Sequence, residues 1–165
     1  MAYKRFDQEL HNKFDKSGRQ VVKEFLSKQG IKAEDNEDKY GVDLVLYKNG
    51  EKQGYAEVEV RPAWKGAKFP YEDLNIPYRK KKLFSNDLKT VFFSINNEMT
   101  HLFWCDAETV LNAKVAVISN KYVKNEKFYK VQLEDLNYEE LWKFLLLASE
   151  FAKFLKDNVL LVAEK

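Results

Sequence analysis

The sequence predicts an α/β domain in which a central mixed sheet is flanked by helices. Residues 3–29 carry apolar side chains at helical spacing, since Phe6, Leu10 and Phe14 recur every four residues. Residues 55–61 alternate between polar and apolar side chains, which is typical of a half-buried strand. Residues 89–96 (KTVFFSIN) form an apolar run of the length of a buried strand. Helix and strand patterns mixed along one chain in this way favour the α/β class.

The composition predicts one domain covering residues 1–165. Hydrophobic residues make up 45% and aromatic residues 15% of the chain, which is enough to build a core. The chain has no apolar run of membrane-spanning length, and its charged N-terminus has no signal-peptide core. We therefore expect a cytoplasmic protein without a membrane partner. A single cysteine, Cys105, excludes an internal disulfide, and its apolar surroundings predict a buried structural thiol.

Other elements are assigned from capping and turn residues. The first helix is expected to end at Gly30, with a break near Gly18 left open. Pro77 is expected to open a helix over residues 78–84, and Asp106 to cap one over residues 107–112. A capping box of Asn137 and Glu140 predicts a last helix over residues 138–155. Further strands are expected at residues 31–34, 42–47, 100–104, 115–119 and 128–133.

Three carboxylates lie within the apolar strands of a predicted hairpin. Glu57 and Glu59 share one face of the second strand with Arg61, while Asp43 interrupts the first strand. Carboxylates on neighbouring strands can share a hard cation such as Mg²⁺, which prefers oxygen ligands. The alternative is a surface hairpin whose acids are ordinary solvated side chains.

The register of the hairpin decides whether these carboxylates share a face. A two-residue turn at Asn49 and Gly50 places Asp43 opposite Ala56, on the wrong face, because a one-residue shift reverses every side chain. A three-residue loop over residues 49–51, or a bulge at Gly54, would bring Asp43 opposite Glu57. We therefore predict one of these two irregularities instead of the simple two-residue hairpin.

The same residues resemble the motif of the PD-(D/E)xK nuclease superfamily. Asp43 is followed fourteen residues later by the run Glu57-Val58-Glu59, and residues 41–44 (GVDL) resemble the entry to this motif in Mrr-like and Holliday-junction-resolvase-like branches. The resemblance covers about residues 17–97. It implies a restriction-endonuclease-like core of order αβββαβ and a divalent-metal-dependent endonuclease acting on DNA. It also implies Mg²⁺ (or Mn²⁺) held by Asp43, Glu57 and the backbone carbonyl of Val58, with Glu59 as the third catalytic acid.

Two positions depart from the superfamily pattern. Glu59 stands where most members have a lysine, although some type II restriction endonucleases of the superfamily carry a glutamate there. The helical acid of Mrr-like relatives would fall at Arg19 or Gln20, so Glu24 is the candidate helix acid, with Asp15 and Glu9 as weaker alternatives.

A basic block, Arg79–Lys82, follows the acids in the sequence. Four consecutive cations in a chain of net charge +2 suit contacts with the phosphates of a nucleic acid, with DNA expected. Arg61 is expected to hold a phosphate or to lower the pKa values of the carboxylates. The alternative is a solvated helix face. The candidate phosphate-binding residues are Arg61, Lys65, Arg79, Lys80, Lys81 and Lys82.

Other activities lack their motifs. The sequence contains no P-loop, dinucleotide-binding turn, CxxC or HExxH pattern, and His11 and His101 are predicted to be surface or half-buried residues instead of ligands. Trp64 is expected to fill the core, with base stacking as the alternative. Besides the endonuclease, two alternatives stay open: a degenerate nuclease fold that serves as a nucleic-acid-binding or assembly subunit, and a protein interaction module. The sequence also leaves a homodimer open.

Overall fold

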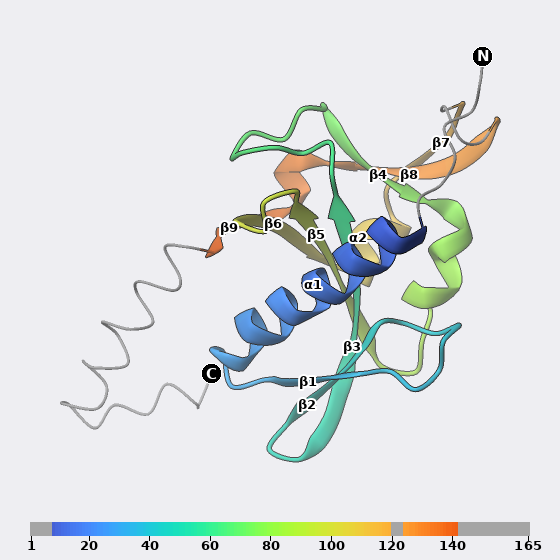
Figure 1. The fold of residues 1–165 in the computed structure, drawn as a ribbon. Helices are drawn as coiled ribbons and strands as arrows, with labels where there is room; N and C mark the ends of the chain where they lie inside the picture. The colour runs from blue at the N-terminus through green and yellow to red at the C-terminus, as the bar shows by residue number, and fades with distance from the viewer. Residues whose placement is uncertain (1–7, 120–123, 142–165) are drawn as a thin grey trace.

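A computed structural model describes residues 8–119 and 124–141, and Figure 1 shows the arrangement of their elements. In this part of the chain the strands form two sheets. A six-stranded sheet has the order β1-β2-β3-β5-β6-β9, and a three-stranded sheet has the order β4-β8-β7. Strands β3 and β5 are parallel and the other pairs are antiparallel, so the predicted mixed sheet is confirmed. The elements are α1 (Gln8–Ser27), β1 (Lys32–Asp35), β2 (Leu44–Lys48), β3 (Glu51–Arg61), β4 (Asp73–Pro77), the 3-10 helix η1 (Tyr78–Phe84), β5 (Lys89–Asn96), β6 (His101–Asp106), α2 (Ala107–Leu111), β7 (Lys114–Ile118), β8 (Glu126–Gln132), the 3-10 turn η2 (Leu133–Asp135) and β9 (Asn137–Glu140).

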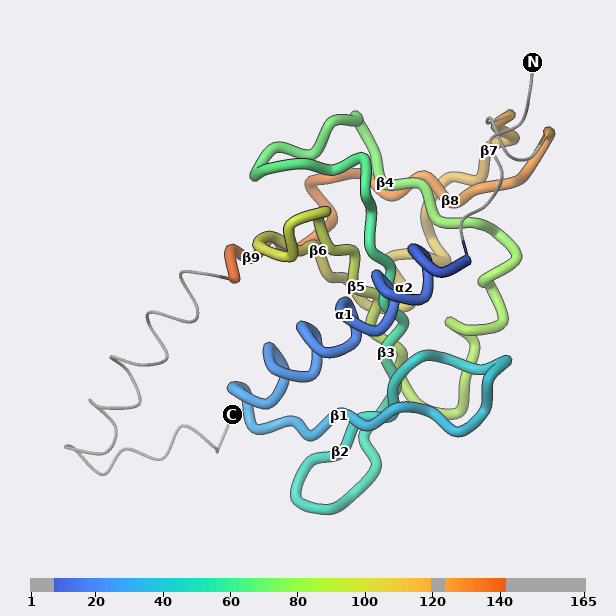
Figure 2. Tube along the Cα trace, viewed as in Figure 1, coloured from blue at the N-terminus to red at the C-terminus, as the bar shows by residue number. Residues whose placement is uncertain are grey.

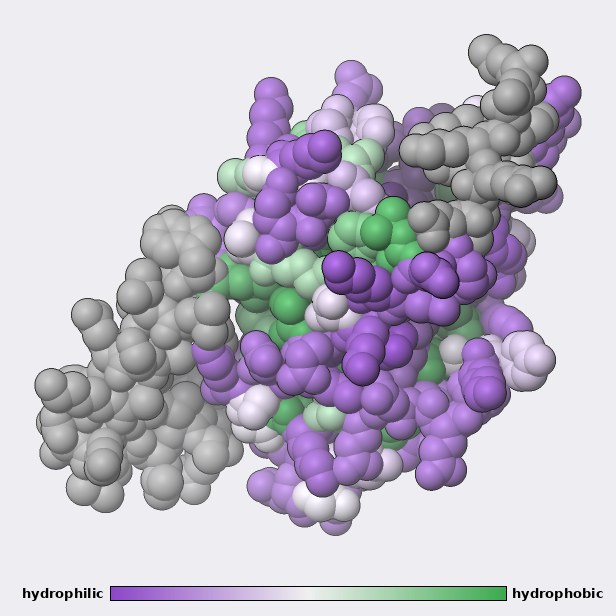
Figure 3. All heavy atoms as spheres, in the orientation of Figure 1, coloured by the Kyte–Doolittle hydropathy of each residue, from purple (hydrophilic) through white to green (hydrophobic). Residues whose placement is uncertain are grey.

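Both faces of the six-stranded sheet are covered. Helix α1 lies across β3 and β5 on one face (Figure 2). Val22 and Phe25 of this helix pack against Phe93. On the other face, Phe92 of β5 packs in a second core with α2, η1 and the small sheet. A strand covered on both sides needs apolar residues facing both ways, which explains the continuous run of β5. Figure 3 shows the resulting surface, which is mostly hydrophilic along α1, with hydrophobic residues visible beside it.

Several local predictions are confirmed. Gly30 follows α1 with a φ of 78°, as a helix-ending glycine does, and η1 begins directly after Pro77. The Asp106 side chain accepts a hydrogen bond from Thr109 N and caps α2. Trp64 and Cys105 are buried in the second core, and burial raises the pKa of the Cys105 thiol to about 12. None of the described helices is long and apolar enough to cross a membrane.

The predicted last helix is wrong at its start. Residues 137–140 form β9, which pairs antiparallel with β6, and the Asn137 side chain donates a hydrogen bond to the backbone oxygen of Trp104. Pairing with an exposed sheet edge satisfies this backbone better than the local capping box does, because tertiary contacts override weak local preferences. The predicted helix beyond Leu141 lies outside the described residues.

The hairpin carries the irregularity that its acids require. Asn49 and Gly50 form a two-residue turn with positive φ at both positions, and Lys48 pairs with Glu51. The register then shifts, because Tyr47 pairs with Lys52 while Leu46 pairs with Gly54, which leaves Gln53 as a bulge. The bulge prediction is therefore confirmed, one residue before the expected Gly54. As Leu44 pairs with Ala56, Asp43 lies across from Glu57.

Helix α1 is unbroken at Gly18, where the sequence left a break open. The glycine is buried against the sheet, and a Cβ at this position would lie 2.6 Å from Cγ2 of Val60. Glycine is therefore needed here for close packing of α1 on β3, and not to end or bend the helix.

We expect the substitution Gly18→Ala to destabilise the protein, although alanine is the better helix former by about 1 kcal/mol. Val60 is β-branched and stiff, so relieving the overlap must move the helix, and overpacking of this kind typically costs about 1–3 kcal/mol. Urea unfolding of the variant measures the change. The exposed neighbour provides a control, since Ser17→Ala should leave stability unchanged or slightly higher; equal stability of both variants would contradict the packing role of Gly18.

Candidate functional site

Asp43 lies where β2 stops and β3 continues alone. Strand β3 pairs with β2 only as far as Ala56, so the edge of β3 beyond this point is not covered by β2. Asp43 Oδ2 accepts a hydrogen bond of 2.8 Å from the backbone N–H of Val58 on this edge. The preceding loop is held by Asn36, whose backbone N–H donates to the Asp43 carbonyl and whose side chain donates to the Val42 carbonyl. The Asp43 carboxylate is thus fixed on the open edge of β3.

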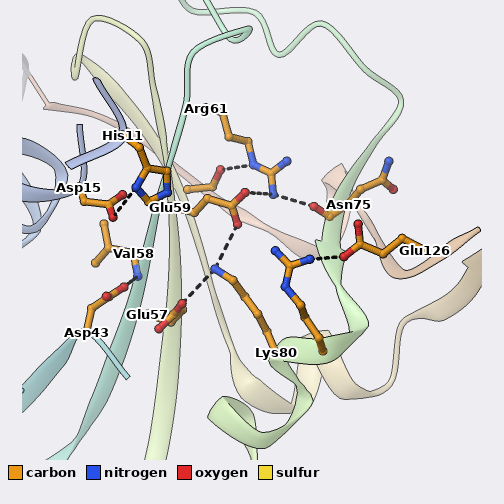
Figure 4. A network of polar contacts seen from close by, with 12 residues as sticks. His11, Asp15, Asp43, Glu57, Val58, Glu59, Arg61, Asn75, Lys80 and Glu126 are labelled. Carbon is orange, nitrogen blue, oxygen red and sulfur yellow. Dashed lines mark hydrogen bonds and ion pairs between the residues drawn. The ribbon is translucent and has the colours of Figure 1, made fainter. Parts of the chain in front are cut away.

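Glu57 is a buried carboxylate with one unsatisfied oxygen. Its side chain is 7% exposed, its Oε1 lies 2.9 Å from the ammonium of Lys80, and its Oε2 is buried without a hydrogen-bond partner (Figure 4). Burial raises the pKa of Glu57 to about 7, with repulsion from Asp43 and Glu59 adding to the rise and Lys80 opposing it. Burial, more than the neighbouring acids, therefore keeps the Glu57 carboxyl protonated up to near-neutral pH.

Glu59 has the opposite electrostatic setting. Burial works against its charged form, but Arg61 and Lys80 outweigh burial and hold the pKa of Glu59 below its ordinary value. The guanidinium of Arg61 lies 3.4 Å from Glu59 Oε1, and the ammonium of Lys80 lies 3.6 Å from Oε2. Two acids on one strand face are thus held at different pKa values, an arrangement that suits division of labour between an ionised acid and one that titrates near neutrality.

Arg61 is a positioning residue for Glu59. Besides the ion pair, its Nε donates to Ser94 Oγ at 2.9 Å and its NH2 group donates to the backbone oxygen of Asn75 at 2.7 Å. These bonds fix the guanidinium between β3, β4 and β5. The predicted effect on the carboxylate pKa therefore has a structural basis at Glu59, whereas the predicted phosphate contact would have to compete with these three partners.

Lys80 makes a contact with the acids that the sequence does not predict. It was expected to contact phosphates as one of four equivalent cations, yet it points inward from η1 and bridges Glu57 and Glu59. Burial lowers the pKa of Lys80, but the two glutamates more than compensate and raise it overall. Because η1 begins directly after Pro77, Lys80 is the cation of the block that faces the acids. The sequence does not predict that η1 packs beside β3.

The other cations of the block face outward. Arg79 forms an ion pair with Glu126 of β8, and Lys81 lies over the ring of Tyr78. Lys82 and Lys65 are exposed on η1 and on the loop after β3. The block is therefore neither a uniform solvated face nor a uniform phosphate-binding surface.

The structure places Asp15 of α1, and not the candidate helix acid Glu24, near Asp43. The two residues are nine positions apart on α1, which places them about half a turn out of phase and about 13 Å apart along the axis. Glu24 accepts a hydrogen bond from Gln20. Asp15 interacts with the charges of Asp43 and Lys80, and its carboxylate lies 3.1 Å from the His11 ring. Burial raises the pKa of Asp15, and Asp43 adds to the rise, while His11 opposes it.

The site contains oxygen donors of the kind that bind a divalent cation, but its acids are not gathered as a ready cluster. Among residues 8–119 and 124–141, no group of three His, Cys, Asp or Glu side chains is close enough to hold a metal ion. In their place the Lys80 ammonium lies between the two glutamates. The unpartnered Glu57 Oε2, facing the electrostatic influence of Asp43, is nevertheless the kind of hard oxygen donor that Mg²⁺ or Mn²⁺ takes.

Comparisons with known proteins give little beyond this geometry. No family model matches the chain, and no curated protein matches it. A search of solved structures finds D212, a nuclease from a fusselovirus, at 14% sequence identity and a TM-score of 0.45, covering 93% of this chain and 99% of that chain. At this TM-score the likeness carries no argument, so the function has to be inferred from the site.

We expect Glu57→Gln to raise stability at alkaline pH in the absence of divalent ions. In the unfolded chain the Glu57 carboxyl ionises near pH 4.5, but in the folded protein only near pH 7, so its ionisation removes stability as pH rises through this window. The difference between variant and wild type should be small at pH 5 and reach about 2–3 kcal/mol at pH 8.

Urea unfolding in EDTA at both pH values measures this difference. Glu24→Gln is the matched control, because that acid is exposed and lies on the other side of α1, and its variant should show no change with pH relative to wild type. A Glu57→Gln advantage that is equal at pH 5 and pH 8 would contradict the raised pKa.

Proposed function

We propose that this protein is a divalent-metal-dependent endonuclease acting on DNA, of the PD-(D/E)xK type. The observation that carries the proposal is the ammonium of Lys80 between two carboxylates of β3, with Asp43 on the open edge of the same strand. Most superfamily members have a lysine at the position of Glu59. Here a lysine from another element, η1, contacts the Glu59 carboxylate and would take the role of that lysine. The order α1, β1, β2, β3, η1, β5, with β3 parallel to β5, supports a restriction-endonuclease-like core; β4, which lies between β3 and η1 in the chain, belongs to the small sheet.

Asp43, Glu57 and the carbonyl of Val58 would hold the metal. The Val58 N–H donates to Asp43 at the uncovered edge of β3, and in an extended strand the carbonyl of the same residue points to the same side of the strand. When bound, Mg²⁺ or Mn²⁺ supplies Lewis-acid polarisation of a phosphate oxygen and a lower pKa for an attacking water. Binding would also neutralise Glu57, and the unpartnered oxygen and raised pKa of this carboxyl support a cation at this position.

Lys80 and Glu59 would handle the charge and the proton of the hydrolysis. A water molecule adds to phosphorus, the P–O bond to the leaving oxygen breaks, and the leaving oxygen takes up a proton. Lys80 is well placed to donate a hydrogen bond to a non-bridging phosphate oxygen, which gains charge in the transition state. Glu59 stays ionised through Arg61 and Lys80, so it orients Lys80 and is available to accept the proton of the water.

A non-enzymatic alternative is favoured by one observation. Lys80 already neutralises part of the acidic charge, and the described residues offer no preformed three-acid cluster. A nuclease fold that only binds nucleic acid or serves in an assembly would have this appearance. Cleavage and metal binding separate the two functions.

The first test is incubation with plasmid, linear, branched and single-stranded DNA in the presence of Mg²⁺, Mn²⁺ or EDTA. We expect cleavage with either metal and none in EDTA, and Glu57→Gln and Asp43→Asn should each abolish it. Divalent ions should raise the Tm of the wild type, because they bind only the folded site, and should not raise that of Glu57→Gln. A wild type without a metal-dependent Tm shift or cleavage would establish the binding subunit instead.

The second test separates Lys80 from its neighbours. We expect Lys80→Ala to lower kcat by about 100-fold or more, as loss of a preorganised donor to a developing oxyanion does. Lys82→Ala, which removes the same charge from the exposed side of η1, should change kcat less than about threefold and act through binding. Equal effects of the two substitutions on kcat would show that Lys80 has no special role.

A further inference from the structure

Two lysines from separate elements lie over one tyrosine ring beside the proposed active site. The ammonium of Lys81, on η1, lies 5.6 Å from the ring centroid of Tyr78, and the ammonium of Lys127, on β8, lies 5.8 Å from it. Tyr129 stacks against the same ring with centroids 5.1 Å apart. We call Tyr78, Lys81, Lys127 and Tyr129 the Tyr78 patch.

The Tyr78 patch has positive charge without a matching acid. In the described part of the chain, neither Lys81 nor Lys127 has a carboxylate within ion-pair distance, and the nearby Glu126 is paired with Arg79. Lys52 shows a similar contact at the hairpin end of the large sheet, 4.5 Å from the ring of Tyr55, whose hydroxyl donates to Asp87. The hydrogen bond with Tyr55 raises the pKa of Lys52, and the charge of Asp87 adds to the rise. Two ammonium groups over one ring repel each other, so an external anion would stabilise the Tyr78 patch.

The position of the patch indicates what that anion is. Lys81 directly follows Lys80, whose ammonium contacts Glu57 and Glu59, so the patch adjoins the acids through a single peptide bond. Successive residues of a 3-10 helix rise by only about 2 Å, so a polyanion with several phosphates is long enough to contact both the acids and the patch. The Tyr78 ring is stacked on Tyr129 and in contact with the ammonium groups of both lysines. Its role is therefore to orient the two cations, since the faces of the ring are already occupied and a base cannot stack on them.

We propose that Lys81 and Lys127, held over Tyr78, bind backbone phosphates of the nucleic acid adjacent to the phosphodiester that is cut. This inference rests on the proposed function and extends it, because it assigns the small sheet, through β8, to substrate binding. Contacts to phosphates position a nucleic acid without reading its sequence, so binding through the patch is sequence-independent.

The test is the salt dependence of binding, measured by fluorescence anisotropy in EDTA with two labelled DNA duplexes of unrelated sequence. For duplex DNA each phosphate contact contributes about 0.9 to the slope of log K against log salt. The variant Lys81→Ala/Lys127→Ala should therefore reduce the magnitude of this negative slope by about 1.8, equally for both sequences. Tyr78→Phe removes only the hydroxyl that accepts a 3.5 Å hydrogen bond from Lys81, and should retain the wild-type slope because both lysines and the ring remain.

The matched control is Lys32→Ala/Lys52→Ala, which removes the same charge from exposed lysines at the hairpin end of the large sheet. It should leave the slope within about 0.3 of wild type. An unchanged slope in Lys81→Ala/Lys127→Ala, or a fall equal to that of the control, would overturn the inference. Binding of polyglutamate as tight as that of DNA would also overturn it, in favour of an acidic peptide.

Cleavage measured in parallel with Mg²⁺ keeps the two proposals distinct. If the slope falls as expected but the wild type cuts no DNA, the phosphate contacts stand and the endonuclease fails. If the wild type cuts DNA and the slope of Lys81→Ala/Lys127→Ala is unchanged, the endonuclease stands and this inference fails.

Discussion

The ion pair between Lys80 and Glu57 is the interaction on which the site depends. It joins η1 to β3 across the second core, at a point where both groups are largely removed from water. A buried carboxylate beside two other acids would otherwise be neutral or repelled, and the ammonium keeps the three acids compatible with folding. The same contact fixes η1, and with η1 it fixes the outward direction of the neighbouring cations.

The packing of η1 explains why this ion pair can form. Phe84, at the end of η1, packs edge-on against Phe92 of β5, and Tyr78, at its start, stacks on Tyr129 of β8. Both ends of the turn are therefore anchored in the second core, which limits the freedom of the lysine between them. Because the entropy of a long side chain is largely lost on burial, such anchoring is a condition for holding Lys80 between two glutamates.

The two glutamates of β3 differ through their neighbours and not through their chemistry. Glu59 has Arg61 two residues away on the same strand face, and Arg61 is itself held by Ser94 and by the Asn75 carbonyl. At Glu57, Lys80 is the cation that lowers the pKa, and the negative charge of Asp43 raises it. One acid is therefore ionised over the whole neutral range, while the other changes its charge near pH 7.

The sequence by itself determined the features that depend on local contacts. Alternation placed Glu57 and Glu59 on one face of β3, and the need to bring Asp43 to that face predicted a bulge, which lies at Gln53. Asp106, Gly30 and Pro77 marked element ends because capping and φ restrictions act over a few residues. The expectations for the metal, for the Val58 carbonyl and for DNA stay predictions.

Only the tertiary structure decided the features that join distant segments. Lys80 reaches the acids because η1 packs on the second core, and Asp15 replaces Glu24 because the docking angle of α1 selects the helix face that meets Asp43. Residues 137–140 became a strand because the edge of β6 was available for pairing. Ion pairs, helix docking and edge pairing depend on distances in space between segments far apart in the chain, and periodicity and spacing along the sequence do not contain those distances.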